Sequence, residues 1–227
     1  LDSAAIYDFL PAGARLFVIN ATAAAPPVLL ETDLAGASPS VIRTSRDTGI
    51  GKDWIPEHRL VSFPSGEGGE AHGIYLPPTN PGVQGPVGAA PPLIVTVHGG
   101  PTAVSSPTFQ LSQLYWTSRG FAILDLNYRG STGFGRDYRR SLYGQWGIFD
   151  VEDAVAGANW LASKGLADPD RLISSGGSAG GYTTLAALAF HDTFAAGASY
   201  FGVSDVEALA RDTHKFESRY LDQLIGP

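Results

Sequence analysis

The stretch Gly176-Gly-Ser-Ala-Gly-Gly181 indicates the fold more strongly than any other part of the chain. It follows a strand-like run at 171–175, opens a helix-like run at 182–190, and contains the pattern G-x-S-x-G with Ser178 at its centre. A serine on such a sharp strand-to-helix turn is exposed on a strained backbone. The glycines two positions away on each side leave room for the adjoining strand and helix. The pattern therefore predicts a nucleophilic serine.

The residues near Ser178 also predict where negative charge would be stabilised. The amide of Ala179 follows the serine at a helix N-terminus and points to where an oxyanion would form. A second donor has to come from another loop, and His98-Gly-Gly-Pro101 follows the first predicted parallel strand. Because Pro101 has no amide hydrogen, Gly100 is the first candidate and Gly99 the second.

Glycine-rich strand-to-helix turns also bind phosphates, and this alternative has to be weighed. A dinucleotide loop needs G-x-G-x-x-G, and counting from Gly176 places Ser178 where the second glycine must stand. A P-loop needs G-K-[ST], and segment 176–181 has no lysine. A structural or phosphate-binding turn is thus the less favoured interpretation. A second glycine-rich segment, 128–135, has the spacing G-x-x-G-x-G, and we expect a surface loop there at the active edge of the sheet.

The composition limits the class of protein and of partner. With 227 residues, 44% of them hydrophobic, the chain can form one large core, or one core and part of another. The net charge of -7 argues against nucleic acid and anionic membrane surfaces, and no apolar run approaches the roughly 20 residues of a membrane helix. There is no cysteine, so disulfides and thiolate metal sites are excluded. This composition is compatible with a reducing compartment, and we expect a cytoplasmic location.

The order of predicted elements indicates an α/β fold. Residues 1–57 read as short strands separated by turns, most clearly at 15–20 and 27–32, and runs 58–63 and 71–76 predict an antiparallel hairpin. Strands and helices then alternate, with strands predicted at 93–97, 121–126, 171–175 and 195–201 and helices at 109–118, 150–161 and 182–190. This order is typical of a largely parallel sheet with helices on both faces, as at the beginning of an α/β-hydrolase.

The histidines of the chain are poor candidates for the catalytic base. In an α/β-hydrolase the triad follows the chain order Ser, Asp or Glu, then His. His98 precedes the serine, and we expect it to order the oxyanion loop instead. His191 lies roughly 20 Å along the helix from Ser178, and His214, a minor alternative, follows only one strand later. We therefore expect the triad Asp and His outside this chain, which we interpret as a piece of a longer protein with little activity alone.

Together these motifs resemble the prolyl oligopeptidase family of serine peptidases, particularly its dipeptidyl-peptidase and acylaminoacyl-peptidase members. The motifs that carry the resemblance are His98-Gly-Gly-Pro101, Asn127-Tyr-Arg-Gly-Ser-Thr-Gly-Phe-Gly135, Asp150-Val-Glu-Asp153 and Gly176-Gly-Ser-Ala-Gly-Gly-Tyr182. The resemblance implies an α/β-hydrolase domain at 58–227 whose last strands are missing. It implies that 1–57 holds the last strands of a β-propeller and a crossing segment. It also implies Ser178 as the nucleophile, with Ala179 and Gly100 as oxyanion donors.

The resemblance extends to a substrate pocket and to a function. Segment 200–209 is similar to the family's lining of the pocket for the residue before the cut. Val203, Val206 and Leu209 would make this pocket aliphatic, and Tyr182 is expected to line it as well. The implied function is a serine peptidase that hydrolyses short peptides through an acyl-enzyme, with no metal and no cofactor. The expected partners are the peptide substrate and the remainder of the protein's own propeller and catalytic domain.

Two other functions remain open. A carboxylesterase or lipase shares the elbow and the H-G-G loop, although the N-terminal β segment and the loop 129–135 favour a peptidase. A non-catalytic binding protein could keep this fold without a working triad. The sequence does not distinguish dipeptidyl, acylaminoacyl and internal cleavage, and it does not indicate an oligomeric state.

Overall fold

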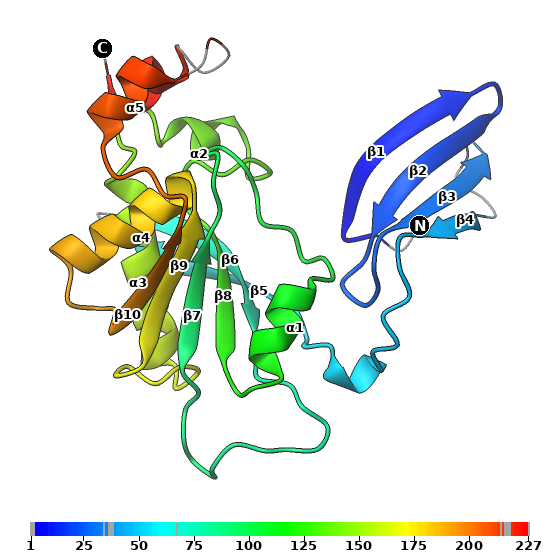
Figure 1. The fold of residues 1–227 in the computed structure, drawn as a ribbon, viewed down its shortest axis with the longest axis horizontal. Helices are drawn as coiled ribbons and strands as arrows, with labels where there is room; N and C mark the ends of the chain where they lie inside the picture. Colours follow the sequence, from blue (N-terminus) through cyan, green and yellow to red (C-terminus); the bar gives the residue numbers. More distant parts are fainter. Residues whose placement is uncertain are drawn as a thin grey trace.

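The computed structural model describes residues 3–33, 35, 39–66, 68–213, 215 and 219–226. They form two sheets, one of four strands in the order β1-β2-β3-β4 and one of six in the order β10-β9-β7-β8-β6-β5 (Figure 1). In the described part of the chain, every helix is too short or too polar to cross a membrane.

The six-stranded sheet is the framework of the larger part. Its strands are β5 (Arg59–Ser65), β6 (Gly69–Leu76), β7 (Leu93–Val97), β8 (Ala122–Asn127), β9 (Leu172–Gly177) and β10 (Ala196–Tyr200). Strands β7, β8, β9 and β10 are parallel, and β6 is antiparallel to both β5 and β8. The predicted hairpin and the predicted parallel strands are therefore confirmed, and with them the expected α/β arrangement.

Helices α1 (Leu111–Thr117), α3 (Phe149–Ser163) and α4 (Ala179–Phe190) pack on the sheet, and they cover both of its faces (Figure 1). The shorter helices α2 (Arg136–Arg140), α5 (Val206–Asp212) and α6 (Tyr220–Ile225) lie beyond one end of the strands. Helix α3 turns Val151, Ala154, Ala158 and Leu161 into the main core, as its sequence period predicts. Helix α1 packs on the opposite face, because Gln113 reaches Asp125 on the side of β8 that also carries Ile123.

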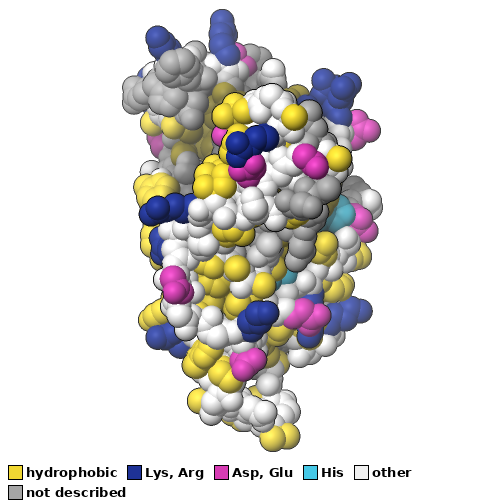
Figure 2. Space-filling view, turned by 90° about the vertical axis from the view of Figure 1, so that its right-hand side faces the viewer, with side chains coloured by type: hydrophobic (Ala, Val, Ile, Leu, Met, Phe, Trp, Pro, Cys, Tyr) yellow, Lys and Arg dark blue, Asp and Glu magenta, His cyan; other side chains and the backbone are white. Residues whose placement is uncertain are grey.

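The four-stranded sheet is an antiparallel meander of β1 (Ala5–Ala12), β2 (Arg15–Ala21), β3 (Val28–Asp33) and β4 (Ser40–Thr44). Strands β2 and β3 confirm the two predictions for this region. The connecting segment, with a 3-10 turn at Lys52–Trp54, leads to the larger part. Figure 2 views the molecule from the side of this sheet, where hydrophobic side chains are open to solvent between scattered charged ones. The two parts touch where Phe109 N donates to Thr22 O at 2.8 Å.

The strand order creates one position suited to a ligand. Strand β7 has β8 on one side and β9 on the other, so the chain reverses its direction of travel across the sheet there. Val97 at the end of β7 pairs with Gly176 near the end of β9. Open α/β sheets bind ligands beyond the carboxyl ends of strands at such a switch point. The loops after β7 and β9 are the two that the sequence singled out.

Candidate active site

Ser178 occupies the turn between β9 and α4 with φ 56° and ψ -120°, and its side chain is exposed. A positive φ is strained for a serine and marks a position held by its surroundings. A Cβ on Gly176 would collide with the backbone carbonyl of Gly180, and a Cβ on Gly180 with the carbonyl oxygen of Val97. The elbow geometry is therefore present, and any side chain at either glycine would push the strands and helix apart.

Backbone hydrogen bonds hold Ser178 in this conformation. Its amide donates to the carbonyl oxygen of Tyr200 at 3.1 Å. Its own carbonyl oxygen accepts from the amides of Tyr182 at 3.2 Å and Val203 at 3.3 Å. Among the described residues, no group forms a hydrogen bond to its hydroxyl. The turn is thus fixed through the main chain, and the side chain is left available to a ligand.

The predicted oxyanion donors lie around this serine. A Cβ built on Gly99 would stand 3.3 Å from Ser178 Cβ and 3.9 Å from Ala179 N, which places the β7 loop directly against the elbow. Ala179 is the first residue of α4, so its amide has no partner within the helix. Within the described part of the chain, the amides of Ala179, Gly99 and Gly100 all lack a hydrogen-bond acceptor. The site therefore presents unpaired donors next to an exposed hydroxyl.

His98 contacts the loop after β7 rather than the serine. Its Nδ1 lies 2.9 Å from Gly99 O and its Nε2 lies 2.8 Å from Ser131 Oγ. Its ring stacks on Tyr128 at 4.4 Å between centroids. Burial lowers the pKa of His98, which favours the neutral ring. In the tautomer with the proton on Nδ1, the ring donates to Gly99 O, and Ser131 Oγ lies 2.8 Å from both Nε2 and Tyr128 O and shares its single proton between these two acceptors. The imidazole thus ties the loop after β7 to the loop after β8.

The prediction of a surface loop at 128–135 is wrong for its first half. Tyr128, Arg129 and Ser131 are buried, and only residues 133–135 are exposed. The reason is a carboxylate from α3: Asp153 accepts from Arg129 N at 2.6 Å and from Arg129 Nε at 2.9 Å. Ser65 Oγ donates to the same carboxylate at 2.5 Å. The loop is anchored to the interior by an ion pair that its glycine spacing did not reveal.

Asp125 is a buried carboxylate that sequence reasoning missed. It accepts hydrogen bonds from Thr96, Ser105 and Gln113, at 2.7–3.0 Å. Burial raises its pKa, and these donors oppose that effect. Asn127, two residues later, exchanges two hydrogen bonds with the backbone of Ser105. Both side chains hold the segment after β7. The only signal for them was a polar residue within the apolar run of β8.

The predicted pocket residues are only half buried. Val203, Val206, Leu209 and Tyr182 all pack against the main core. The Tyr182 ring also lies 5.2 Å from the ring of Trp146, between centroids. Tyr182 and Val203 lie next to the elbow, because their amides donate to Ser178 O, and the part of all four residues in a substrate pocket stays a prediction.

The two histidines that follow Ser178 in the sequence were considered as possible catalytic bases. His191 follows the last residue of α4, twelve residues of helix away from Ser178, as predicted. His214 lies outside the described residues. None of the described histidines forms a hydrogen bond to Ser178, so the catalytic base has no candidate in the described part.

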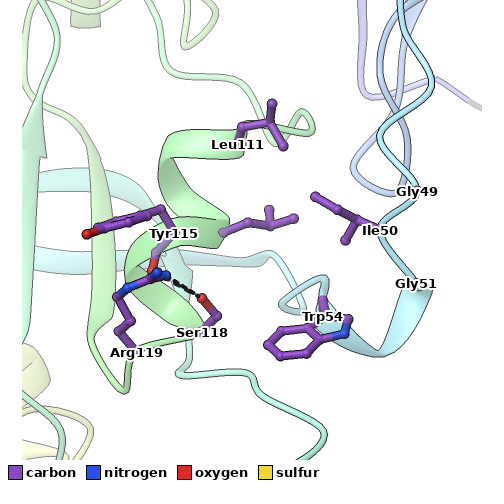
Figure 3. Close-up of a pocket in the computed structure, with 9 residues that line it drawn as sticks. Gly49, Ile50, Gly51, Trp54, Leu111, Tyr115, Ser118 and Arg119 are labelled. Carbon is purple, nitrogen blue, oxygen red and sulfur yellow. Dashed lines mark hydrogen bonds between the residues drawn. The ribbon is translucent and has the colours of Figure 1, made fainter.

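A cavity of about 380 Å³ lies elsewhere, between the connecting segment and α1. Figure 3 shows Ile50 and Trp54 of the connecting segment on the side that faces α1, whereas the Tyr115 side chain points away from them. None of its lining residues belongs to the elbow or to the oxyanion loop. It is therefore separate from the candidate active site.

Relatives in other organisms match parts of this chain. Dipeptidyl aminopeptidase BIII of Pseudoxanthomonas mexicana is 34% identical over 142 residues, which are 62% of this chain and 21% of that protein. The acylamino-acid-releasing enzyme of Arabidopsis thaliana is 42% identical over 97 residues, 43% of this chain and 13% of that protein. The chain thus spans about a fifth or less of these relatives' length.

Solved structures extend the similarity to nearly the whole chain. A puromycin-hydrolyzing peptidase of Mycobacterium tuberculosis aligns with a TM-score of 0.94 and 42% identity, over 97% of this chain and 34% of that one. The acylaminoacyl peptidase of Pyrococcus horikoshii aligns with a TM-score of 0.81 and 28% identity, over 97% and 35%. The six-stranded sheet and its helices therefore have the α/β-hydrolase fold of these peptidases. The profile of the prolyl oligopeptidase family matches residues 107–226, more than half of the sequence, and the chain belongs to that family.

Proposed function

We propose that the full-length protein is a serine peptidase that hydrolyses short peptides through an acyl-enzyme on Ser178. The observation that carries the proposal is the exposed Ser178 hydroxyl beside the unpaired amides of Ala179 and the Gly99–Gly100 loop. An acyl transfer needs this combination of a free nucleophile and donors for the tetrahedral oxyanion. The relatives support it, since they are named as peptidases, and one neighbour, puromycin hydrolase, was solved in complex with PGG.

Gly100 is the preferred second oxyanion donor. In a trans peptide the C=O of one residue and the N–H of the next point in opposite directions. His98 holds the carbonyl of Gly99 at 2.9 Å, so the Gly100 N–H in the same peptide unit points away from the imidazole. The Gly99 amide belongs to the preceding peptide unit, whose carbonyl oxygen, His98 O, accepts from Tyr128 OH at the longer distance of 3.2 Å. Ala179 and Gly100 together would then form the oxyanion hole, with Gly99 as the alternative.

The rest of the machinery belongs to the full-length protein in this proposal. The relatives are about three to eight times as long as the part that aligns, which leaves room for the triad Asp and His and for a propeller. We assign residues 1–57 to the last propeller strands and the crossing segment, and 58–227 to the catalytic domain. In support, Ile6, Tyr7, Phe9 and Leu10 of β1 are all more than half exposed, as expected for a blade that lacks its neighbour. The cytoplasmic location stays a prediction.

The pocket for the residue before the cut is assigned to Val203, Val206, Leu209 and Tyr182. Tyr182 and Val203 donate hydrogen bonds to Ser178 O, and the aliphatic and aromatic side chains of the four residues would favour apolar substrates. Val206→Asp should raise KM for substrates with an apolar residue at that position, while a polar substrate is affected less. An unchanged KM for the apolar substrate would remove this assignment.

A fluorophosphonate probe on the full-length protein tests the nucleophile directly. We expect covalent labelling at Ser178 and none in Ser178→Ala. A panel of aminoacyl-nitroanilides and short-acyl esters then separates the enzyme classes. Turnover of esters without amide hydrolysis would indicate a carboxylesterase, and absence of labelling would indicate a non-catalytic protein.

A further inference from the structure

Asp150 is a buried carboxylate that no step of the proposed reaction uses. It stands in the first turn of α3 and is fully buried. It accepts two short hydrogen bonds, from Thr183 Oγ1 at 2.5 Å and from Gly147 N at 2.6 Å. Burial raises the pKa of Asp150 to about 6. Burying a carboxylate costs desolvation free energy, which an apolar side chain of similar size would not cost. The presence of Asp150 here therefore indicates a role other than filling space.

The partners of Asp150 belong to the elbow helix and to the loop that supports it. Thr183 lies one turn into α4, and its hydroxyl is also 3.2 Å from the carbonyl oxygen of Ala179. A Cβ on Gly147 would stand 2.9 Å from the ring of Tyr182, so this loop packs directly on α4. Asp150 thus fixes both sides of the first turn that follows Ser178.

We propose that Asp150, acting through Thr183, is a positioning residue for the nucleophile elbow. It sets the rotation of the first turn of α4, and with it the direction of the Ala179 amide and of the Ser178 side chain. The inference rests on the proposed function, because the direction of these groups matters only if they take part in acyl transfer. A displacement well below 1 Å at a reacting group is enough to reduce a rate strongly.

The hydrogen bonds also indicate which property of Asp150 matters. In Asp150→Asn the side-chain oxygen can still accept from Gly147, and the side-chain amide can donate to Thr183 Oγ1. The Thr183 hydroxyl would then donate to Ala179 O, which already lies within reach. The link therefore survives loss of the charge, whereas Thr183→Val removes it and leaves Asp150 with one partner.

The experiment measures kcat and KM of the full-length protein for Thr183→Val, Thr183→Ser and the control Thr184→Val. Thr184 is a buried neighbour on α4 whose hydroxyl bonds to Ser174 of β9 and not to α3, so it reports the general effect of removing a buried hydroxyl. We expect Thr183→Val to lower kcat about tenfold at unchanged KM. Thr183→Ser and Thr184→Val should stay within about threefold of the unchanged protein.

Labelling by the fluorophosphonate separates the possible failures. If the unchanged protein is not labelled at Ser178, the proposed function fails. If it is labelled and Thr183→Val reacts as fast, or if Thr184→Val is equally slow, the positioning role of Asp150 is wrong.

If Thr183→Val does not fold, a second variant, Asp150→Asn, tests the inference. Asp150→Asn should keep its labelling rate within about threefold, because its side-chain amide can replace both hydrogen bonds. A labelling rate of Asp150→Asn as low as that of Thr183→Val would overturn the inference that this hydrogen-bonded link positions the elbow.

Discussion

Two glycine-rich loops flank β7 in this molecule, and they have opposite roles. The loop after β9 leaves the hydroxyl of Ser178 exposed and without a partner among the described residues. The loop after β8 buries Arg129 and Ser131 and gives both of them hydrogen-bond partners. The comparison teaches that glycine spacing sets only the path of the backbone. Whether the polar groups are satisfied internally decides which loop can act on a ligand.

Replacing Ser178 tests the first loop and should have the largest effect. Ser178→Ala in the full-length protein should reduce kcat/KM for an aminoacyl-nitroanilide by about 10⁴-fold or more, because the acyl-enzyme can no longer form. The free energy of unfolding should change little, since the hydroxyl makes no hydrogen bond in the described part. Residual activity above a few per cent would show that the exposed loop is not the catalytic one.

Replacing Asp153 tests the second loop, where the effect should be on stability. Asp153→Ala leaves the Arg129 guanidinium buried without its main partner, which should lower the free energy of unfolding by about 3–5 kcal/mol. Glu152→Gln is the matched control, because that partner is 40% exposed and should cost no more than about 1 kcal/mol. Urea denaturation followed by tryptophan fluorescence measures both, and equal losses would contradict the internal role of this ion pair.

Asp150 is relevant to both loops, because it is a buried scaffold residue that bonds to Thr183 in the helix that follows the elbow. Its pKa rises from 3.8 to about 6, so the folded state holds the proton more tightly than the unfolded state. The contribution of this group to stability is therefore greatest below about pH 4 and is lost as pH rises through about 6. Relative to Asp150→Asn, the unchanged protein should lose up to about 3 kcal/mol between pH 4 and pH 7.

Urea denaturation at several pH values measures this difference. Asp170→Asn, at an exposed aspartate, is the control and should show no comparable trend. A stability difference that is constant with pH would mean that the Asp150 carboxylate has an ordinary pKa in the folded protein.

His98 contacts both the loop after β7 and the loop after β8. Among the four predictions, its replacement should have the smallest effect. His98→Ala releases the Gly99 carbonyl and should lower kcat about tenfold, because the Gly100 amide loses its fixed direction. In His98→Asn the amide nitrogen lies close to the place of Nδ1 and should restore most of the rate. His98→Gln reaches toward Ser131 instead and should not. Equal kcat values for the two amide variants would mean that the bond to Gly99 does not orient the loop.

The sequence predicted the framework of the site well, for local reasons. Apolar runs of strand length alternating with helical periods gave β7 to β10 with α1, α3 and α4. The elbow could be predicted because the pattern G-x-S-x-G is contained in five consecutive residues, although the atom that excludes a side chain at Gly180 is the carbonyl oxygen of Val97 on β7. The burial of residues 128–131 in the second glycine-rich loop could not be predicted from its own sequence. Its anchor, Asp153, lies on another element and has a partner, Ser65, that is 88 residues away in sequence.

The α/β order, the strained turn at Ser178 and the family of the chain can thus be inferred from the order and spacing of residues along the chain. Which polar groups stay free for chemistry, and which ones hold the scaffold, depends on how the elements pack. This packing places His98 against Gly99 and Ser131, and Asp150 against Thr183. The physical reason is that backbone conformation follows from neighbours along the chain, whereas the burial and pairing of a polar side chain depend on residues brought together only when the sheet and helices pack.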